Sequence, residues 1–253
     1  MRSLIGALRL SRAVLQVLKG LLVMALRFPS LDVAGRQERI RWWSAGVLRS
    51  MGITLHASGA AAPGAALMAA NHISWLDIVA IHSVAPHARF VSKADVLVWP
   101  LLGWMVRTAG TLFIERERKR DAVRVVHAMA EALRAGQTVA VFPEGTTGAG
   151  PALLPFHANL LQAAISTGTP VQPVVLRFSD DSGRFSRAVE FLGETTLLQS
   201  VWRIACARGL VAHVALLAPL DTAQADRRAL AGQLQGRIQA ALGAPDAGQA
   251  PSS

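Results

Sequence analysis

Cysteine is nearly absent from the sequence, with Cys206 as the single example in 253 residues. One thiol cannot close an internal disulfide, and no cysteine-based metal site can be built from it. Ile204, Ala205 and Ala207 surround it with apolar side chains, which favours an inert, buried thiol. This usage is typical of a protein that works in a reducing compartment such as the cytoplasm.

Acidic residues are also scarce, because 16 Asp and Glu stand against 26 Lys and Arg and leave a formal net charge of +10. Such a charge favours a polyanionic partner, either nucleic acid or an anionic membrane. Tyr is absent, no zinc-finger spacing occurs, and the basic residues lie among long apolar runs. The sequence therefore predicts an anionic membrane surface as a partner and no nucleic acid.

Charged residues make up only 17% of the chain and hydrophobic residues 52%, which argues against disorder and suggests that surplus apolar surface meets lipid. Residues 4–26 are rich in Leu, Val and Ala, but Arg9, Arg12 and Lys19 interrupt them, so no run of 18 uncharged residues is available to span a bilayer. These scattered bases also differ from the pattern of a secretory signal.

The basic residues of this N-terminal segment share one side of a helix. At 100° per residue, an arc of roughly 100° contains Arg2, Arg9, Arg12, Lys19 and Arg27. We expect an interfacial helix whose basic face meets lipid phosphates. The alternative is a helix packed on the core with a solvated basic edge.

A second helix is predicted over 36–51, where Trp42 and Trp43 suit a membrane interface. Residues 1–52 would then form an amphipathic helical hairpin. We expect this hairpin to hold the protein, as a peripheral or monotopic enzyme, on the cytoplasmic face of the inner membrane.

The rest of the chain alternates short apolar strands with helices, which is typical of α/β folds with a mixed sheet flanked by helices. We expect one domain over 53–243 and a disordered tail over 244–253. Strands are expected at 53–56, 66–70, 89–91, 110–114, 138–142, 171–178 and 211–217, and further helices at 121–135, 160–166 and 222–242.

Residues 71–77, NHISWLD, follow the strand at 66–70, where α/β folds place active-site loops. A lipid hydroxyl needs a base of near-neutral pKa to attack a thioester, and imidazole offers one. A carboxylate bonded to the other ring nitrogen would fix the tautomer and stabilise the imidazolium. We expect His72 in the turn and Asp77 in the following helix, although His-x4-Asp alone also suits a structural histidine.

Three further segments follow in order. Residues 110–116, GTLFIER, end in Arg116, whose guanidinium can bind phosphate bidentately or can belong to the solvated run 115–120. Residues 142–147, FPEGTT, follow a buried strand and could be merely its closing turn. Residues 169–175, TPVQPVV, carry prolines that predict an edge or irregular strand.

Together these four segments, within residues 53–220, resemble the motifs of the glycerolipid acyltransferases, whose best-known members are the 1-acyl-sn-glycerol-3-phosphate acyltransferases. The resemblance implies that His72 is the general base and Asp77 its support. It also assigns the acceptor and acyl-chain sites to Arg116, Glu144, Gly145, Thr146, Thr147 and Pro173.

Two positions depart from the family pattern. Thr147 stands where an arginine is common, which puts lysophosphatidate in doubt as the acceptor. The form Glu-Gly-Thr-Thr resembles branches that acylate lyso-ornithine lipid or lysophosphatidylcholine. Gln172 replaces a usual aliphatic residue.

The sequence therefore predicts an O-acyltransferase of phospholipid biosynthesis that transfers a fatty acyl group from acyl-CoA or acyl carrier protein to the free hydroxyl of a lysolipid. The acceptor would be of the 1-acyl-sn-glycerol-3-phosphate type, without a metal or a bound cofactor. The alternatives are a lyso-ornithine lipid O-acyltransferase and a catalytically silent lipid-binding protein on the same fold. A serine hydrolase is disfavoured because no Gly-x-Ser-x-Gly elbow occurs.

Overall fold

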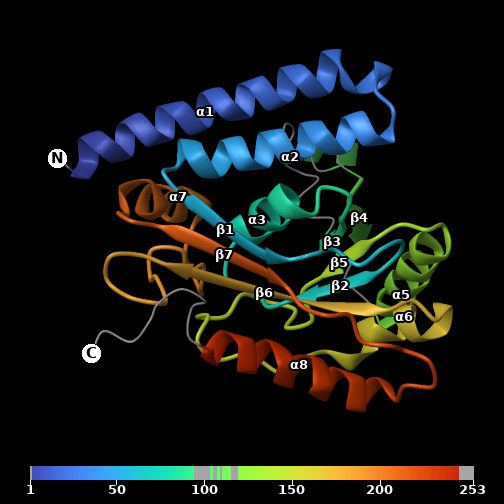
Figure 1. The fold of residues 1–253 in the computed structure, drawn as a ribbon. Coiled ribbons are helices and arrows are strands. Elements are labelled where there is room, and N and C mark those ends of the chain that lie inside the picture. Colours follow the sequence, from blue (N-terminus) through green and yellow to red (C-terminus); the bar gives the residue numbers. More distant parts are fainter. Residues whose placement is uncertain (1, 94–102, 105–106, 109, 115–118, 245–253) are drawn as a thin grey trace.

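The computed structural model describes residues 2–93, 103–104, 107–108, 110–114 and 119–244. Its centre is a seven-stranded sheet in the order β1-β7-β6-β2-β5-β3-β4, in which only the β6–β7 pair is antiparallel (Figure 1). The strands are β1 Thr54–Gly59, β2 Leu67–Ala70, β3 Arg89–Lys93, β4 Leu112–Ile114, β5 Val139–Val141, β6 Val171–Ser179 and β7 Val211–Leu216. The expected mixed sheet is confirmed.

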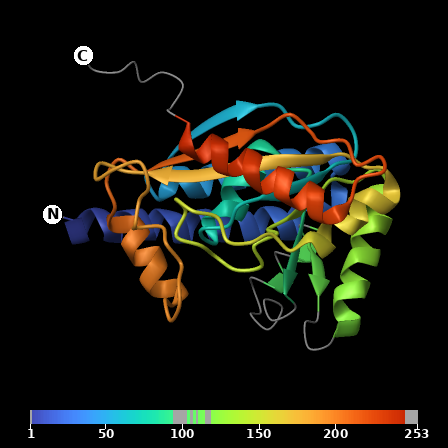
Figure 2. The same cartoon turned by 90° about the horizontal axis from the view of Figure 1, so that it is seen from below.

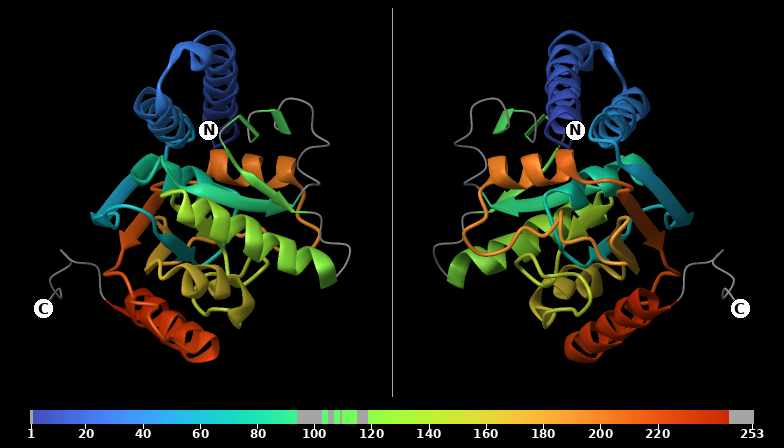
Figure 3. Two further views of the ribbon diagram at one scale, coloured as in Figure 1. Left: turned by 90° about the vertical axis from the view of Figure 1, so that its right-hand side faces the viewer. Right: turned by 90° about the vertical axis from the view of Figure 1, so that its left-hand side faces the viewer.

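Helices cover both faces of this sheet, as expected. The helices are α1 Arg2–Leu26, α2 Val33–Ser50, α3 Leu76–Val84, α5 Lys119–Arg134, α6 Gln162–Thr167, α7 Leu197–Cys206 and α8 Arg227–Gly243. One face packs on α3, with α2 and α7 alongside and α1 outermost, whereas α5, α6 and α8 cover the other face (Figures 2 and 3).

The long strand β6 carries apolar side chains on both faces of the sheet, so helices must cover both faces. Val171 and Val175 join the cluster under α5, α6 and α8, whereas Val174 and Leu176 join the cluster under α3. Successive side chains of a strand point to opposite faces, so a strand buried on both sides reads as an uninterrupted apolar run.

The expectation that prolines place residues 169–175 at an edge or in an irregular strand is wrong in its edge form, because β6 lies between β7 and β2. Pro173 has no N–H to donate, but the β6–β7 pairing begins only at Val174. The neighbouring Gln172 side chain supplies a donor instead, with its Nε2 3.1 Å from the Leu217 carbonyl oxygen. Gln172 is fully buried, so the same amide that departs from the aliphatic pattern satisfies a carbonyl beside the proline.

The N-terminal hairpin expected from the sequence is present, and its helices interlock through glycines. A Cβ on Gly20 would lie 2.2 Å from Trp43 Nε1, and one on Gly46 would lie 2.1 Å from Gln16 Nε2. The Trp43 indole N–H donates to the Gln16 carbonyl at 3.2 Å. Trp43 is therefore used to join α1 to α2 and does not extend from the hairpin as the interfacial reading would require.

Arg9 does not belong to the outward basic face that the sequence predicted. Its guanidinium turns inward and donates to the carbonyls of Ala205 and Ala207 at the end of α7, with the Ala205 bond at 3.1 Å. These carbonyls have no partner within their own helix, and a cation near a helix C-terminus is favourable. Arg12 and Lys19 remain exposed.

The outward side of α1 is apolar. We call it the leucine face, and it consists of Leu4, Leu8, Leu15, Leu18, Leu22 and Leu26, each 54–77% exposed. These residues fall within an arc of roughly 80° on the helix. No helix in the described part of the chain is long and apolar enough to cross a membrane.

Two C-terminal helices differ from the expectation. Helix α7 was not foreseen, although Thr196 and Gln199 form a capping box at its start, which is a recognisable sequence signal. Helix α8 begins at Arg227, five residues later than expected, because the Asp226 side chain accepts hydrogen bonds from the first backbone N–H groups. The expected tail lies outside the described residues beyond 244.

Candidate active site

The first and third sequence motifs meet because they follow adjacent parallel strands. Strand β2 pairs with β5 in the same direction, with Ala69 opposite Val141. The turns 71–75 and 142–148 therefore leave the same edge of the sheet, where α/β folds gather their functional loops. The backbone N–H of Gly148 donates to the His72 carbonyl at 2.7 Å and joins the two turns directly.

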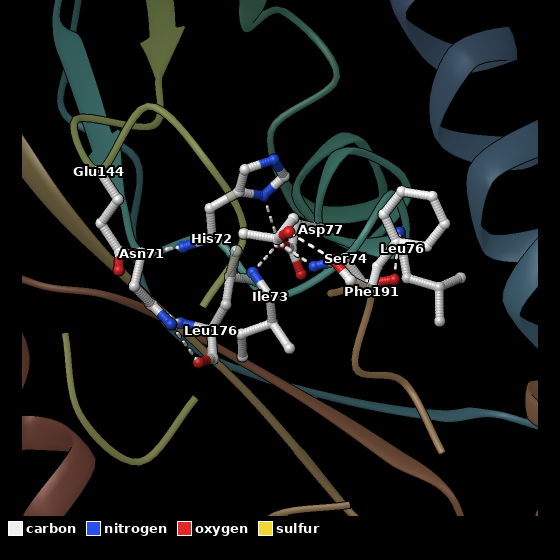
Figure 4. Close-up of polar contacts among 10 residues, drawn as sticks. Asn71, His72, Ile73, Ser74, Leu76, Asp77, Glu144, Leu176 and Phe191 are labelled. Atoms are coloured by element: carbon white, nitrogen blue, oxygen red, sulfur yellow. Dashed lines mark hydrogen bonds and ion pairs between the residues drawn. The ribbon is translucent and has the colours of Figure 1, made fainter. Parts of the chain in front are cut away.

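His72 lies in the first turn and Asp77 in the first turn of α3, as the spacing indicated. His72 Nδ1 lies 2.7 Å from Asp77 Oδ2, so the ring N–H donates to the carboxylate (Figure 4). The same oxygen accepts the backbone N–H groups of Ile73 at 2.6 Å and Ser74 at 2.9 Å. Ile73 and Ser74 precede α3, so the carboxylate supplies the acceptor that these buried N–H groups need.

This arrangement prepares one ring nitrogen for proton transfer. Because Nδ1 keeps its proton and donates it in the hydrogen bond to Asp77, the neutral ring presents the lone pair of Nε2, which has no hydrogen-bond partner among the described residues. The His72 side chain is 20% exposed and that of Asp77 is fully buried. A substrate can therefore reach the base while the carboxylate that orients it is shielded from water.

Asn71, which the sequence analysis did not single out, anchors the turn. Its Nδ2 donates to the Leu176 carbonyl at 2.8 Å, and its Oδ1 accepts the Leu176 N–H at 2.7 Å. The amide thus extends the β2–β6 pairing by one residue beyond Ala70. The sequence signal that could have identified Asn71 is an amide side chain directly after an apolar strand, because backbone groups at the end of a buried strand need hydrogen-bond partners.

Glu144 holds two backbone segments together with its two oxygens. Oε1 accepts the His72 N–H at 2.7 Å, and Oε2 accepts the Leu154 N–H at 2.8 Å. Burial raises the pKa of Glu144, while these hydrogen bonds oppose the rise by stabilising the carboxylate. The structure therefore gives Glu144 a shaping role, and its expected direct contact with the acceptor stays a prediction.

The remaining residues of the third motif lie on the same turn. Gly145 has a φ of 73°, a conformation that favours glycine, and a Cβ there would lie 3.0 Å from the His157 ring. Thr146 is exposed. Thr147 donates its hydroxyl hydrogen to the Phe191 carbonyl, which ties this turn to the segment before α7.

The other predicted substrate residues are not brought into this cluster. Arg116 lies outside the described residues. Pro173 is buried in β6 opposite Ala69, and its part in an acyl-chain site stays a prediction. In the described part of the chain, no group of three or more His, Cys, Asp or Glu side chains could hold a metal ion.

Comparisons with known proteins show the family to which the chain belongs. A family model described as Acyltransferase matches residues 52–177. A lyso-ornithine lipid O-acyltransferase of Pseudomonas aeruginosa is 37% identical over 217 residues, which are 85% of this chain and 83% of the relative. A 1-acyl-sn-glycerol-3-phosphate acyltransferase of Neisseria meningitidis is 38% identical over 200 residues, 78% of each protein.

The fold also has a solved counterpart. The crystal structure of the 1-acyl-sn-glycerophosphate acyltransferase PlsC from Thermotoga maritima superposes with a TM-score of 0.67 at 19% identity, over 93% of this chain and 96% of that one. At this identity the likeness concerns the fold. Because curated relatives more than 30% identical match across most of their length, the chain belongs to the acyltransferase family that includes the 1-acyl-sn-glycerol-3-phosphate and lyso-ornithine lipid acyltransferases.

Proposed function

We propose that this acyltransferase transfers a fatty acyl group from the thioester of acyl-CoA or acyl carrier protein to the free hydroxyl of a lysolipid, in phospholipid biosynthesis. The observation that carries the proposal is the 2.7 Å bond between His72 Nδ1 and Asp77 Oδ2, which leaves Nε2 to face a substrate. An intact base with its orienting carboxylate also argues against the silent lipid-binding alternative.

The chemistry follows from that bond. His72 Nε2 takes the proton of the acceptor hydroxyl as its oxygen attacks the thioester carbonyl. The resulting imidazolium is stabilised by Asp77, and the tetrahedral oxyanion collapses by breaking the carbon–sulfur bond. The carrier thiolate then takes the proton from Nε2, which leaves an ester, a free thiol and the enzyme in its starting state.

The test is transfer by the purified protein from labelled acyl-CoA or acyl carrier protein to a panel of lysolipids, with His72→Ala as the matched control. We expect ester formation with at least one lysolipid and a loss of about 10² to 10⁴-fold in the control. A folded His72→Ala variant that retained more than about a tenth of the turnover would contradict the proposal.

The primary acceptor in this proposal is of the 1-acyl-sn-glycerol-3-phosphate type. A lyso-ornithine lipid is the second candidate, and Thr147 favours it, since no guanidinium is placed at this position for a phosphate. The relative from Pseudomonas aeruginosa, named a lyso-ornithine lipid O-acyltransferase, supports the same candidate.

The leucine face supports a second part of the proposal, that the enzyme sits on the cytoplasmic side of an anionic membrane as a peripheral protein. A contiguous exposed apolar stripe is unusual on a soluble surface and marks an interaction site. Arg12 and Lys19 lie beside one edge of the stripe, where long basic side chains can reach lipid headgroups while the leucines enter the acyl region. The acceptor would then be taken from the bilayer in which it resides.

A further inference from the structure

The flat face of the His72 ring is covered by Phe142. The two ring centroids lie 3.9 Å apart and the ring planes differ by 11°, so the rings are stacked face to face. Phe142 belongs to the turn after β5, and His72 to the turn after β2, so the contact joins the same two motifs that the backbone bonds join.

The turn 142–148 therefore holds His72 at three points. Phe142 covers the ring, Glu144 Oε1 accepts the backbone N–H at 2.7 Å, and the Gly148 N–H donates to the backbone carbonyl at 2.7 Å. Together with Asp77 at Nδ1, these contacts fix the backbone, one ring nitrogen and the ring plane.

Phe142 is itself in contact with a further ring. Phe90 stacks on it with centroids 5.7 Å apart and planes at 23°, and the buried His82 meets Phe90 edge-on at 4.9 Å. Side chains packed in this way have few alternative rotamers. The row of rings keeps Phe142 against the imidazole.

We propose that Phe142 is a positioning residue for the transfer reaction: its ring fixes the plane of the His72 imidazole, so that Nε2 points to the acceptor hydroxyl, and its π face stabilises the imidazolium that forms. A single hydrogen bond at Nδ1 leaves the ring free to rock about that bond, whereas a face-to-face contact removes this freedom. An aromatic face also attracts a cation held over it. Within the part of the chain that the structure describes, the charged groups that form hydrogen bonds with His72 are the carboxylates of Asp77 and Glu144, and neither restricts the ring plane.

The inference rests on the proposed role of His72 as the base, and the test separates the two. Phe142→Leu keeps an apolar side chain but removes the flat ring, Phe142→Tyr keeps the ring, and Phe90→Leu removes only the ring that packs on Phe142. We expect Phe142→Leu to lower kcat about ten- to a hundred-fold with little change in KM, because the loss lies in geometry at the reacting atoms. Phe142→Tyr should restore most of kcat, and Phe90→Leu should fall between the two.

Two readouts distinguish a positioning role from general damage. The acid limb of the pH–rate profile should move to lower pH in Phe142→Leu, since the imidazolium loses its aromatic partner. In NMR spectra of histidine-labelled wild-type protein, the carbon-bound protons of His72 should be shifted upfield by the Phe142 ring current, and Phe142→Leu should abolish this shift. Thermal unfolding of each variant checks that the fold is retained.

Equal loss of kcat in Phe142→Tyr and Phe142→Leu would overturn the inference, as would a folded Phe142→Leu enzyme with wild-type kcat and pH profile. Absence of the ring-current shift in the wild-type protein would overturn it without any variant. If His72→Ala kept full activity while the ring-current shift was present, the proposed function would fail and the stacking geometry would stand.

Discussion

Asp77 Oδ2 is the most heavily used atom of the site, since it accepts one side-chain and two backbone hydrogen bonds. An asparagine there would have to present an NH₂ group or its one oxygen to three donors. We therefore expect Asp77→Asn to lower kcat/KM by about 10² to 10⁴-fold, because the His72 tautomer and the turn are both disturbed. The measurement is steady-state transfer on folded protein, and a Ser74→Ala variant, which retains its backbone N–H, serves as the control.

Thr147 is the residue at which we expect acceptor choice to be adjustable. A phosphomonoester carries a charge near −2 and gains from a bidentate guanidinium more than a lyso-ornithine lipid does. Thr147→Arg should therefore raise the ratio of kcat/KM for lysophosphatidate to that for lyso-ornithine lipid.

The structure adds a necessary control for this substitution. Thr147 donates to the Phe191 carbonyl, so any replacement also releases that segment. Thr147→Val removes the hydroxyl without adding a charge, and it should leave the acceptor ratio unchanged. If Thr147→Val and Thr147→Arg altered the ratio equally, the segment around Phe191 and not the charge would determine the acceptor.

His82 predicts how stability depends on pH. Burial lowers its pKa to about 4 from a usual value of 6.5, although its hydrogen bond to the Ala88 carbonyl opposes the shift. As the pH falls below about 6.5, His82 becomes protonated in the unfolded chain, whereas in the folded chain it stays neutral until the pH is near 4. The free energy of unfolding therefore decreases between these two pH values. The loss at pH 5 is about 2 kcal/mol.

The measurement is urea unfolding at pH 7.5 and pH 5, compared with His82→Gln. Glutamine can still donate an amide hydrogen to the Ala88 carbonyl but does not titrate in this range. The variant should lose correspondingly less stability between the two pH values. Equal losses in both proteins would show that other groups cause the acid destabilisation.

At the scale of single residues, the sequence was sufficient where the chemistry is local. The His72–Asp77 bond was predicted from a local motif, a spacing of five that became specific through its resemblance to the acyltransferase motif. Partners far along the chain were not foreseeable: Glu144 bonds to the His72 backbone, and Asn71 bonds to Leu176, only after β2, β5 and β6 have paired. The prediction that Arg9 faces lipid was wrong, because helical periodicity shows which residues share a face but not whether that face contacts lipid, solvent or another helix.

Among the elements, α1 carries the clearest test, because its leucine face has no partner within the described part of the chain. Replacing Leu15, Leu18 and Leu22 with Ser should weaken binding to lipid vesicles about a hundred-fold, since each leucine contributes roughly 1 kcal/mol when it enters the acyl region. Vesicle sedimentation measures the change.

The two exposed bases beside the leucine face give the matched control for α1. Arg12→Gln combined with Lys19→Gln should weaken binding only to anionic vesicles, and added salt should reduce the difference in affinity between this variant and the wild type. Arg9 is left unchanged because its bonds to α7 hold the helix to the body of the protein. Wild-type affinity in the triple serine variant would contradict the proposed membrane role of the leucine face.

Element boundaries could be predicted where periodicity or a break is strong. Helix α5 was expected at 121–135 and spans Lys119–Arg134, with Val125, Met129 and Leu133 buried on one side as expected. The predicted edge position of β6 was wrong. Proline is confined to edges because it lacks a backbone N–H, and here the Gln172 side-chain amide donates at the end of the neighbouring strand instead. Such compensation depends on tertiary contacts and leaves no periodic signal.

For the whole molecule, the alternation of strands and helices indicated an α/β fold with a mixed sheet, and this is confirmed. The strand order was not predicted, since apolar runs of similar length do not specify which neighbours pair. That order brings together turns from two distant parts of the chain and so creates the site.

The long-range hydrogen bonds of the catalytic turn also have a consequence for the order of events in folding. His72 is bonded to Glu144 across 72 positions, and Asn71 to Leu176 across 105. Contacts of such separation close large loops, and they form late compared with helices, which assemble in microseconds. During refolding from urea, the helical circular dichroism signal should therefore recover before transfer activity. Enzyme activity would then report the formation of these long-range contacts, among them the pairing of β6 with β2.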